Sequence, residues 1–237
     1  MNFNLDLLLE NLKNLNIDIN DTQISRLDRY TGLLTEKNKV MNLTSIEGPD
    51  ESAVKHLADS ISVMAAADFK PGAKVIDVGT GAGFPGVPLL IMNPEINLTL
   101  LDSTGKKLAF ISEALEELGI KAETLHRRAE EAGKDSERRE KYDYAVSRAV
   151  ASLNVLCEYC LPLIKTGGSF IAMKGPKAED EIREAENALN ILGGKVDKII
   201  PVGLTDGAER NLIVIKKTKS TPQKYPRPSA QISKKPL

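Results

Sequence analysis

The residues best suited to chemistry in this chain form a glycine-rich loop, Asp77-Val-Gly-Thr-Gly-Ala-Gly83, directly after an apolar run. Glycine lets a backbone turn sharply and approach a bound molecule closely. A carboxylate at the start of the loop can face the cationic amino acid group of S-adenosylmethionine (SAM), whereas it would repel the pyrophosphate of a dinucleotide. The loop therefore predicts a SAM site in which Asp77, Gly79 and Gly81 bind the cofactor.

The same loop leaves a second enzyme class open. The spacing Gly81-x-Gly83-x-x-Gly86 satisfies the dinucleotide-binding pattern, so an NAD-dependent oxidoreductase is an alternative. Asp102 closes the next apolar run, where its carboxylate can accept hydrogen bonds from the hydroxyls of an adenosine ribose. Because NAD-binding enzymes place an acid in the same way, Asp102 predicts a nucleoside without saying which one. Alternatively, Asp102 caps the helix that is expected from about residue 104.

The elements that must position these residues follow from the spacing of apolar side chains. Leucines recur at helical spacing near the amino end, so residues 1–66 predict a helical cap. Short apolar runs then alternate with helical patterns, such as the one at 104–118 that ends at Gly119, which predicts a parallel sheet covered on both faces. The last two strands should form an antiparallel hairpin at one end of the sheet, because the loop between them is too short for a crossover. The expected strands are residues 73–78, 96–101, 121–125, 143–147, 168–173, 196–202 and 210–216.

The carboxyl end of the chain differs in charge from the rest. The net charge is -1, yet residues 216–237 hold seven basic residues and no acid. This concentration of positive charge predicts a polyanionic partner. Three prolines within residues 221–228 and a lack of periodicity predict that residues 218–237 are a basic extended tail behind a domain of residues 67–217. All predicted pocket residues precede residue 177, so the tail is expected to contact the polyanionic partner and not the cofactor.

Length and composition argue against several other classes of protein. A chain of 237 residues suits one α/β domain with a smaller appendage. No apolar run approaches the roughly 20 residues that span a bilayer, and the amino end lacks the pattern of a signal peptide, so we expect a cytoplasmic protein with no membrane partner. Two cysteines, Cys157 and Cys160, are too few for a disulfide framework or a four-cysteine zinc site. We expect buried, inert thiols, with a redox-active pair as the alternative.

Further motifs, taken with their order and spacing, resemble the bacterial family of small-subunit ribosomal RNA guanine N7-methyltransferases, also called glucose-inhibited division protein B. The resemblance covers almost the whole chain. It implies a Rossmann-like, seven-stranded SAM-dependent methyltransferase fold with an N-terminal helical extension. The motifs are Asp77–Gly86, Leu101-Asp102-Ser103, Arg128-Ala129-Glu130, Ser147-Arg148-Ala149-Val150-Ala151, Met173-Lys174-Gly175, Arg210-Asn211-Leu212, Asn42-Leu43-Thr44, His56-x-x-Asp59-Ser60 and Lys224-Tyr225-Pro226-Arg227.

The resemblance also implies roles for residues around the cofactor. Gly79 and Phe84 belong to the loop around SAM, Ala129 and Glu130 flank its adenine, and Arg148 lies beside the site at the end of the fourth strand. These residue types suit such roles, because Phe84 can cover an apolar face and a backbone amide can donate to an adenine nitrogen. For Arg148 the alternative is a surface ion pair, which contributes little.

The implied substrate is N7 of a guanine in 16S ribosomal RNA, either naked, in the small subunit or in its assembly intermediate. Guanine N7 has an in-plane lone pair, so we expect neither a catalytic base nor a metal, and catalysis by alignment alone. We place His56, Arg148, Lys174 and Arg227 near the RNA, while His56 could instead pack the cap onto the domain. A nonenzymatic RNA-binding protein that uses the basic tail is a further alternative.

Overall fold

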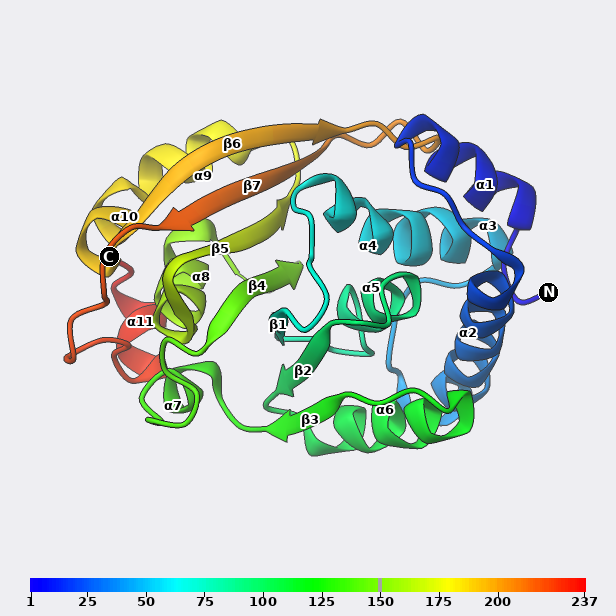
Figure 1. Cartoon of the computed structure of the whole chain (residues 1–237), viewed down its shortest axis with the longest axis horizontal. Coiled ribbons are helices and arrows are strands. Elements are labelled where there is room, and N and C mark those ends of the chain that lie inside the picture. Colours follow the sequence, from blue (N-terminus) through cyan, green and yellow to red (C-terminus); the bar gives the residue numbers. More distant parts are fainter. Residues whose placement is uncertain (149–150) are drawn as a thin grey trace.

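The central element of the molecule is a single mixed β-sheet (Figure 1). The computed structural model describes residues 1–148 and 151–237, and these form a seven-stranded sheet in the order β3-β2-β1-β4-β5-β7-β6. The first five strands in this order are parallel, and β7 runs antiparallel to both of its neighbours. The expected strands and the terminal hairpin are therefore confirmed. The strands are β1 (Lys74–Val78), β2 (Asn97–Asp102), β3 (Glu123–His126), β4 (Tyr142–Arg148), β5 (Ile164–Lys174), β6 (Gly194–Val202) and β7 (Arg210–Lys217).

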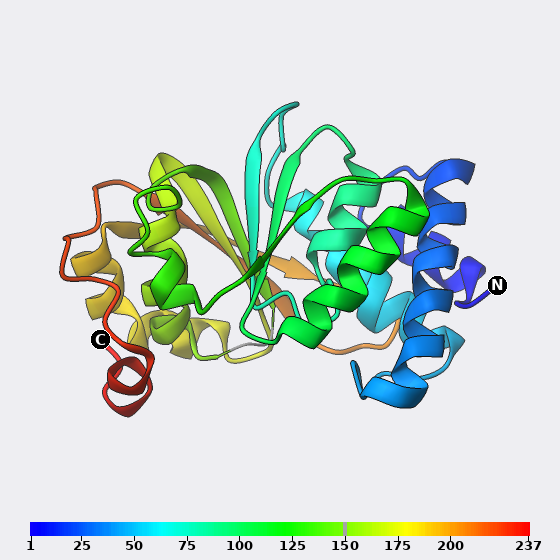
Figure 2. The same cartoon turned by 90° about the horizontal axis from the view of Figure 1, so that it is seen from below.

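Helices cover both faces of this sheet, as Figure 2 shows from below. One face carries α5 (Gly86–Met92) and α6 (Gly105–Leu118), and the other carries α8 (Leu153–Cys160), α9 (Ala178–Glu184) and α10 (Glu186–Leu192). Successive strand residues point to opposite faces. Val75 accordingly joins the apolar cluster on the first face and Ile76 the cluster on the second. Two buried faces explain why central strands such as β1 and β2 have nearly continuous apolar sequences.

The N-terminal segment adds helices both beside and outside α5 and α6: α4 lies next to α5, whereas α2 packs on the outer side of α5 and α6 (Figure 1). Its buried residues, such as Leu27 and Leu57, belong to the same apolar cluster as Leu89 and Phe110 of the domain. The cap therefore extends the core of the domain, and its predicted limit at residue 66 stays a prediction. Its elements are α1 (Leu5–Asn14), α2 (Asp21–Met41), α3 (Pro49–Glu51), a π-helical segment (Ser52–Ala58), α4 (Asp59–Ile61) and a 3-10 turn (Ser62–Ala65).

The C-terminal segment is packed against the domain, which corrects the expectation of an extended tail. Arg139 donates hydrogen bonds to the carbonyl oxygens of Thr221 (2.6 Å) and Tyr225 (2.8 Å). Ile232 is fully buried and lies in a short helix, α11 (Ser229–Lys234). The composition of the segment does not predict these contacts. A few buried apolar side chains and one arginine of the domain are enough to hold a proline-rich segment in place.

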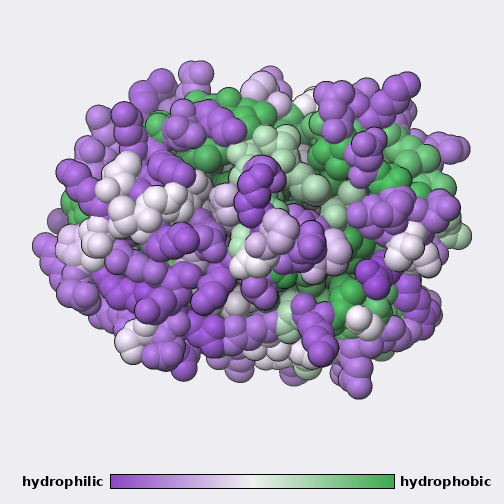
Figure 3. Space-filling model, viewed as in Figure 1, coloured by the Kyte–Doolittle hydropathy of each residue, from purple (hydrophilic) through white to green (hydrophobic). Residues whose placement is uncertain are grey.

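The surface also differs between the two halves of the molecule. On the face shown in Figure 3, hydrophilic residues cover the side of α7 (Ala129–Ala132) to α11, while hydrophobic residues gather mainly over the N-terminal helices. Among the described residues, no helix has both the length and the apolar character needed to cross a membrane. The hydrophilic side includes the basic C-terminal segment.

Candidate functional site

The glycine-rich loop lies at the carboxyl edge of the sheet, between the ends of β2 and β4. Gly79, Gly81 and Gly83 have left-handed φ angles of +75°, +60° and +89°, which L side chains rarely adopt. Gly79 and Gly81 line a cleft. A Cβ atom on Gly83 would instead collide with the Tyr30 hydroxyl, and one on Gly86 would lie 2.8 Å from the Asp77 carboxylate. Gly79 and Gly81 thus line the cleft, whereas Gly83 and Gly86 are required by packing.

Asp77 lies beneath the loop and does not line the cleft, which corrects its predicted contact with the cofactor. Its Oδ2 accepts hydrogen bonds from the Thr80 hydroxyl (2.6 Å) and from the backbone N–H of Gly86 (2.8 Å). Burial raises the pKa of Asp77 to about 6, although these two hydrogen bonds oppose the rise. Gly86 begins α5, so a carboxylate already occupies the helix terminus that would hold a pyrophosphate. This geometry disfavours the dinucleotide interpretation.

Asp102 connects the second strand to the glycine-rich loop. Its Oδ2 accepts from the backbone N–H of Gly81 at 2.9 Å, and its Oδ1 accepts from that of Thr104 at 2.8 Å. Thr104, and not Asp102, directly precedes α6. Two carboxylate oxygens offer about four acceptor positions, so Asp102, which lines the cleft, can still accept from ribose hydroxyls. The helix-start and cofactor roles are therefore compatible.

A stack of side chains joins the cap to the loop. The ring of His56 stacks on that of Phe84 with centroids 4.2 Å apart, and the Arg148 guanidinium lies 5.3 Å from the Phe84 centroid. The His56 Nε2 atom is 3.0 Å from the Thr44 hydroxyl, while Nδ1 has no hydrogen-bond partner among the described residues. Burial, helped by the charge of Arg148, lowers the pKa of His56 to about 3. His56 is therefore a neutral residue that packs the cap onto the domain, but it also lines the cleft, and its predicted contact with RNA stays a prediction.

The cleft has a volume of about 510 Å³, which is within the usual range for a small-molecule site. Its donors and acceptors suit SAM: Asp102 can accept from ribose hydroxyls, and Ala129 and Glu130 begin α7, where the first backbone N–H groups have no acceptor within the helix. The N–H groups of Gly79 and Gly81 already donate to the carbonyl oxygen of Leu101 and to Asp102, so it is their carbonyl oxygens that can accept from the ammonium of the amino acid group. All of the predicted cofactor residues except Asp77 line this cleft, namely Gly79, Gly81, Phe84, Asp102, Ala129, Glu130 and Arg148.

Comparisons with known proteins agree with this geometry. A family model described as rRNA small subunit methyltransferase G matches residues 23–214. The chain is 49% identical to ribosomal RNA small subunit methyltransferase G of Alkaliphilus oremlandii, over 98% of each protein. The chain belongs to the rRNA small subunit methyltransferase G family. It is also 49% identical to the protein of that name from Acetivibrio thermocellus, over 98% of this chain and 96% of the relative.

The fold of this family member is also that of more distant methyltransferases. A solved structure of a SAM-dependent methyltransferase from Aquifex aeolicus aligns with a TM-score of 0.51 at 20% sequence identity. The alignment covers 66% of this chain and 89% of the Aquifex chain. The seven-stranded methyltransferase fold predicted from the sequence is confirmed.

Lys174 lies outside the cofactor cleft of this rRNA small subunit methyltransferase G family member. It lines a second cavity of about 540 Å³, which Arg148 also lines. Its ammonium group is paired with Glu181 at 2.6 Å and donates to the carbonyl oxygen of Ala151. A contact of Lys174 with RNA stays a prediction. Ala149 and Val150, which follow Arg148 in its motif, lie outside the described residues.

Arg227 is held in an ion pair beneath the C-terminal segment. Its guanidinium Nη2 lies 2.6 Å from Oε2 of Glu158, which is fully buried. Arg227 does not line the cleft, and its predicted contact with RNA stays a prediction. Two residues away, Ser229 does line the cleft, beside Tyr159, whose hydroxyl lies 3.2 Å from that of Ser229. The expectation that every pocket residue precedes residue 177 is therefore wrong.

The two cysteines are buried on the second face of the sheet. Burial raises the pKa of both thiols, so each stays protonated and unreactive at neutral pH. This confirms the expectation of buried thiols. Within residues 1–148 and 151–237, no cluster of histidine, cysteine and acidic side chains has the composition of a metal site.

Proposed function

We propose that this chain transfers a methyl group from SAM to N7 of a guanine in 16S ribosomal RNA of the cytoplasmic small subunit or its assembly intermediate. The observation that carries the proposal is the cleft at the carboxyl edge of the sheet. In this cleft the glycine-rich loop is held from below by Asp77 and from the side by Asp102. Negative charge around an open backbone loop suits a cationic nucleoside. The names of the relatives supply the class of RNA.

The chemistry of the proposed transfer requires little from side chains. SAM, when bound, supplies an electrophilic methyl group, and guanine N7 attacks it with an existing lone pair. No proton has to leave N7 first, and the neutral His56 adds no positive charge beside the cleft. Holding the reacting atoms in line can contribute ~7 kcal/mol or more to lowering the barrier. The rigid contacts among the loop, the cap and Arg148 suit this task.

Basic residues in the cleft and along the C-terminal segment support a nucleic acid partner. Arg127, Arg128 and Lys107 line the cofactor cleft, where phosphates of a bound strand would approach. Along the C-terminal segment, five lysines are exposed to solvent while its opposite face is packed on the domain. These lysines are Lys216, Lys219, Lys224, Lys234 and Lys235.

The proposal is tested by incubating the protein with methyl-labelled SAM and ribosomal subunits from cells that lack this enzyme. We expect label in 16S RNA of small subunits and none in 23S RNA of large subunits. Titration with NAD in parallel should give no binding. Binding of NAD without methyl incorporation would support the oxidoreductase, and binding of RNA without incorporation would support the nonenzymatic alternative.

A further inference from the structure

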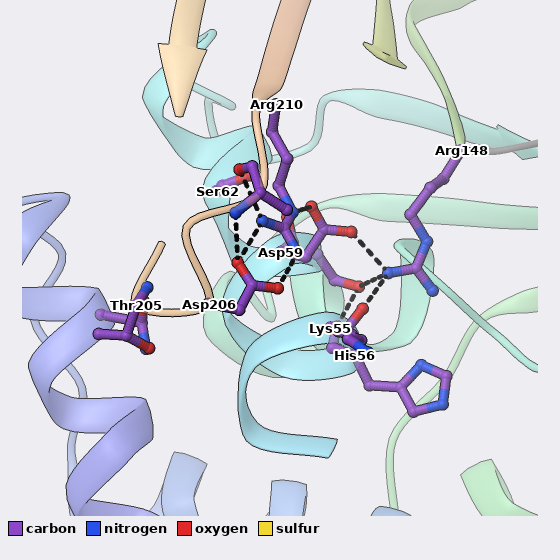
Figure 4. Close-up of polar contacts among 11 residues, drawn as sticks. Lys55, His56, Asp59, Ser62, Arg148, Thr205, Asp206 and Arg210 are labelled. Carbon is purple, nitrogen blue, oxygen red and sulfur yellow. Dashed lines mark hydrogen bonds and ion pairs between the residues drawn. The ribbon is translucent and has the colours of Figure 1, made fainter. Parts of the chain in front are cut away.

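Asp59 connects two arginines that come from different strands (Figure 4). It begins α4 in the cap, one helical turn after His56. Its Oδ2 lies 2.9 Å from the Arg148 guanidinium at the end of β4, and its Oδ1 lies 3.1 Å from Arg210 Nε at the start of β7. The three side chains are only 14–16% exposed. Such shielded, charge-assisted contacts are stronger than surface ion pairs.

Arg148 lies at the boundary between the two cavities of this edge. It lines the cofactor cleft and also the second cavity, which Lys174 and Arg210 line. The cap supplies the described groups that bind its Nη1: the carbonyl oxygen of Lys55 (2.8 Å), the Asp59 carboxylate and, more weakly, the Ser60 hydroxyl (3.4 Å). Of these partners only Asp59 carries charge. Asp59 is therefore the main electrostatic constraint on where the guanidinium points.

Arg210 differs from Arg148 because it has a second carboxylate. Asp206 lies 2.6 Å from Arg210 Nη2, and within the described part of the chain it makes no hydrogen bond or ion pair with Arg148, so it contacts only one of the two arginines. Without the charge of Asp59, Arg210 would keep Asp206, whereas Arg148 would keep only neutral acceptors. Substituting Asp59 should therefore change the orientation of Arg148, whereas substituting Asp206 should affect only the stability of this network.

We propose that Asp59 is a positioning residue for methyl transfer, because its carboxylate holds the Arg148 guanidinium between the cofactor cleft and the second cavity. This inference rests on the proposed function. Because Arg148 lines both cavities, an RNA strand that occupies the second cavity while its guanine enters the cleft would contact this guanidinium. The orientation of Arg148 then affects the reacting complex more than it affects the initial capture of RNA.

The test compares Asp59→Asn with Asp206→Asn as a matched control and Asp59→Glu as a rescue. Each variant is measured for kcat and RNA KM on small subunits, with thermal unfolding and SAM titration to count folded sites. We expect Asp59→Asn to lower kcat roughly tenfold or more, the effect of losing one charged hydrogen-bond partner, and to change RNA KM less than about threefold. Asp206→Asn should keep kcat within about twofold, and Asp59→Glu should recover part of the loss.

Several results would overturn the inference. Equal losses of kcat in Asp59→Asn and Asp206→Asn would show that the network only stabilises the fold. An unchanged kcat in Asp59→Asn would remove any positioning role while leaving the proposed function intact. Absence of methylation by the unaltered protein would overturn the proposed function and this inference together.

Discussion

Gly79 and Gly72 hold nearly the same left-handed backbone, with φ of +75° and +77°, but only Gly79 lines the cofactor cleft. Replacing either glycine with aspartate therefore introduces similar backbone strain, on the order of 1–2 kcal/mol. Gly79→Asp should abolish SAM binding without unfolding the protein, because a charged side chain enters the space of the ligand. Calorimetric titration of both variants checks this, with Gly72→Asp expected to bind normally. Equal SAM affinity in the two variants would remove the loop from the site.

Asp102 has two tasks that a single substitution affects together. Asp102→Ala should weaken SAM and its demethylated product alike, by ~1 to 3 kcal/mol, because both share the ribose that would donate to the carboxylate. The same change should also lower the unfolding temperature, since the Gly81 and Thr104 amides lose their acceptor. Titration with each ligand, beside thermal unfolding, checks this. A variant that is less stable but binds both ligands normally would restrict Asp102 to holding the loop.

For single residues, the sequence predicts those positions that follow from a local motif. Gly79, Gly81 and Asp102 were predictable because each stands at a fixed place relative to the end of a strand. The burial of Asp77 and the proximity of Ser229 to Tyr159 were not, because they depend on how distant segments pack. The motifs that contain Asp59 and Arg210 were visible, but only the fold reveals that they form an ion pair.

The C-terminal segment has one face on the domain and one toward solvent. Substitutions can therefore separate its proposed binding of RNA from its packing on the domain. Replacing Lys219, Lys224, Lys234 and Lys235 with glutamine removes only exposed charges, none of which lines the cleft. If three or four of them contact RNA phosphates, the slope of log affinity against log salt should flatten by about 2 to 3. SAM affinity should not change. RNA binding across a salt series checks this, and an unaltered slope would show that these lysines do not contact RNA.

Removing an anchor of this segment should instead affect stability. Arg227→Ala leaves the fully buried Glu158 with the backbone N–H of residue 227 but without its charged partner, which should cost about 3 kcal/mol in the free energy of unfolding. Lys219→Ala, an exposed change in the same segment, is the control. Urea unfolding of both variants measures the difference. A loss for Arg227→Ala no larger than for the control would mean that the ion pair contributes nothing to docking the segment.

The contrast between strands and tail shows which elements a sequence predicts. Strands such as β1 and β2 are buried on both faces, so their apolar runs are continuous and bounded by polar residues. The C-terminal segment is fixed by Tyr225, Ile232 and hydrogen bonds from Arg139, a residue that is 82 positions away from Thr221. Composition averaged over the segment does not reveal so few anchors.

Over the whole molecule, the cap and the domain form one structure around the loop. Tyr30 of α2 donates a hydrogen bond to the carbonyl oxygen of Ala82 at 2.6 Å, and His56 stacks on Phe84. The loop is thus held by the cap from one side and by Asp77 from below. Global stability should therefore respond to the ionisation of Asp77.

Asp77 has a pKa of about 6 in the folded protein against an ordinary value of 3.8. The folded state consequently keeps a proton between about pH 4 and 6 that the unfolded chain has lost. The contribution of Asp77 to stability is present below pH 4 and falls by roughly 3 kcal/mol as pH rises through 6. Asp77→Asn cannot titrate, so its stability relative to the unaltered protein should increase over this range. Urea unfolding without SAM at several pH values checks this; a constant difference would mean that Asp77 titrates normally.

The central claim is that the cleft presents the methyl group of SAM to guanine N7 of small-subunit RNA. The most direct measurement is nucleoside analysis of 16S RNA after reaction of unmodified small subunits with methyl-labelled SAM. We predict that the label is recovered as 7-methylguanosine from a single position. Recovery as a base methylated on an exocyclic amine or on carbon, or the absence of label from the RNA, would contradict the account.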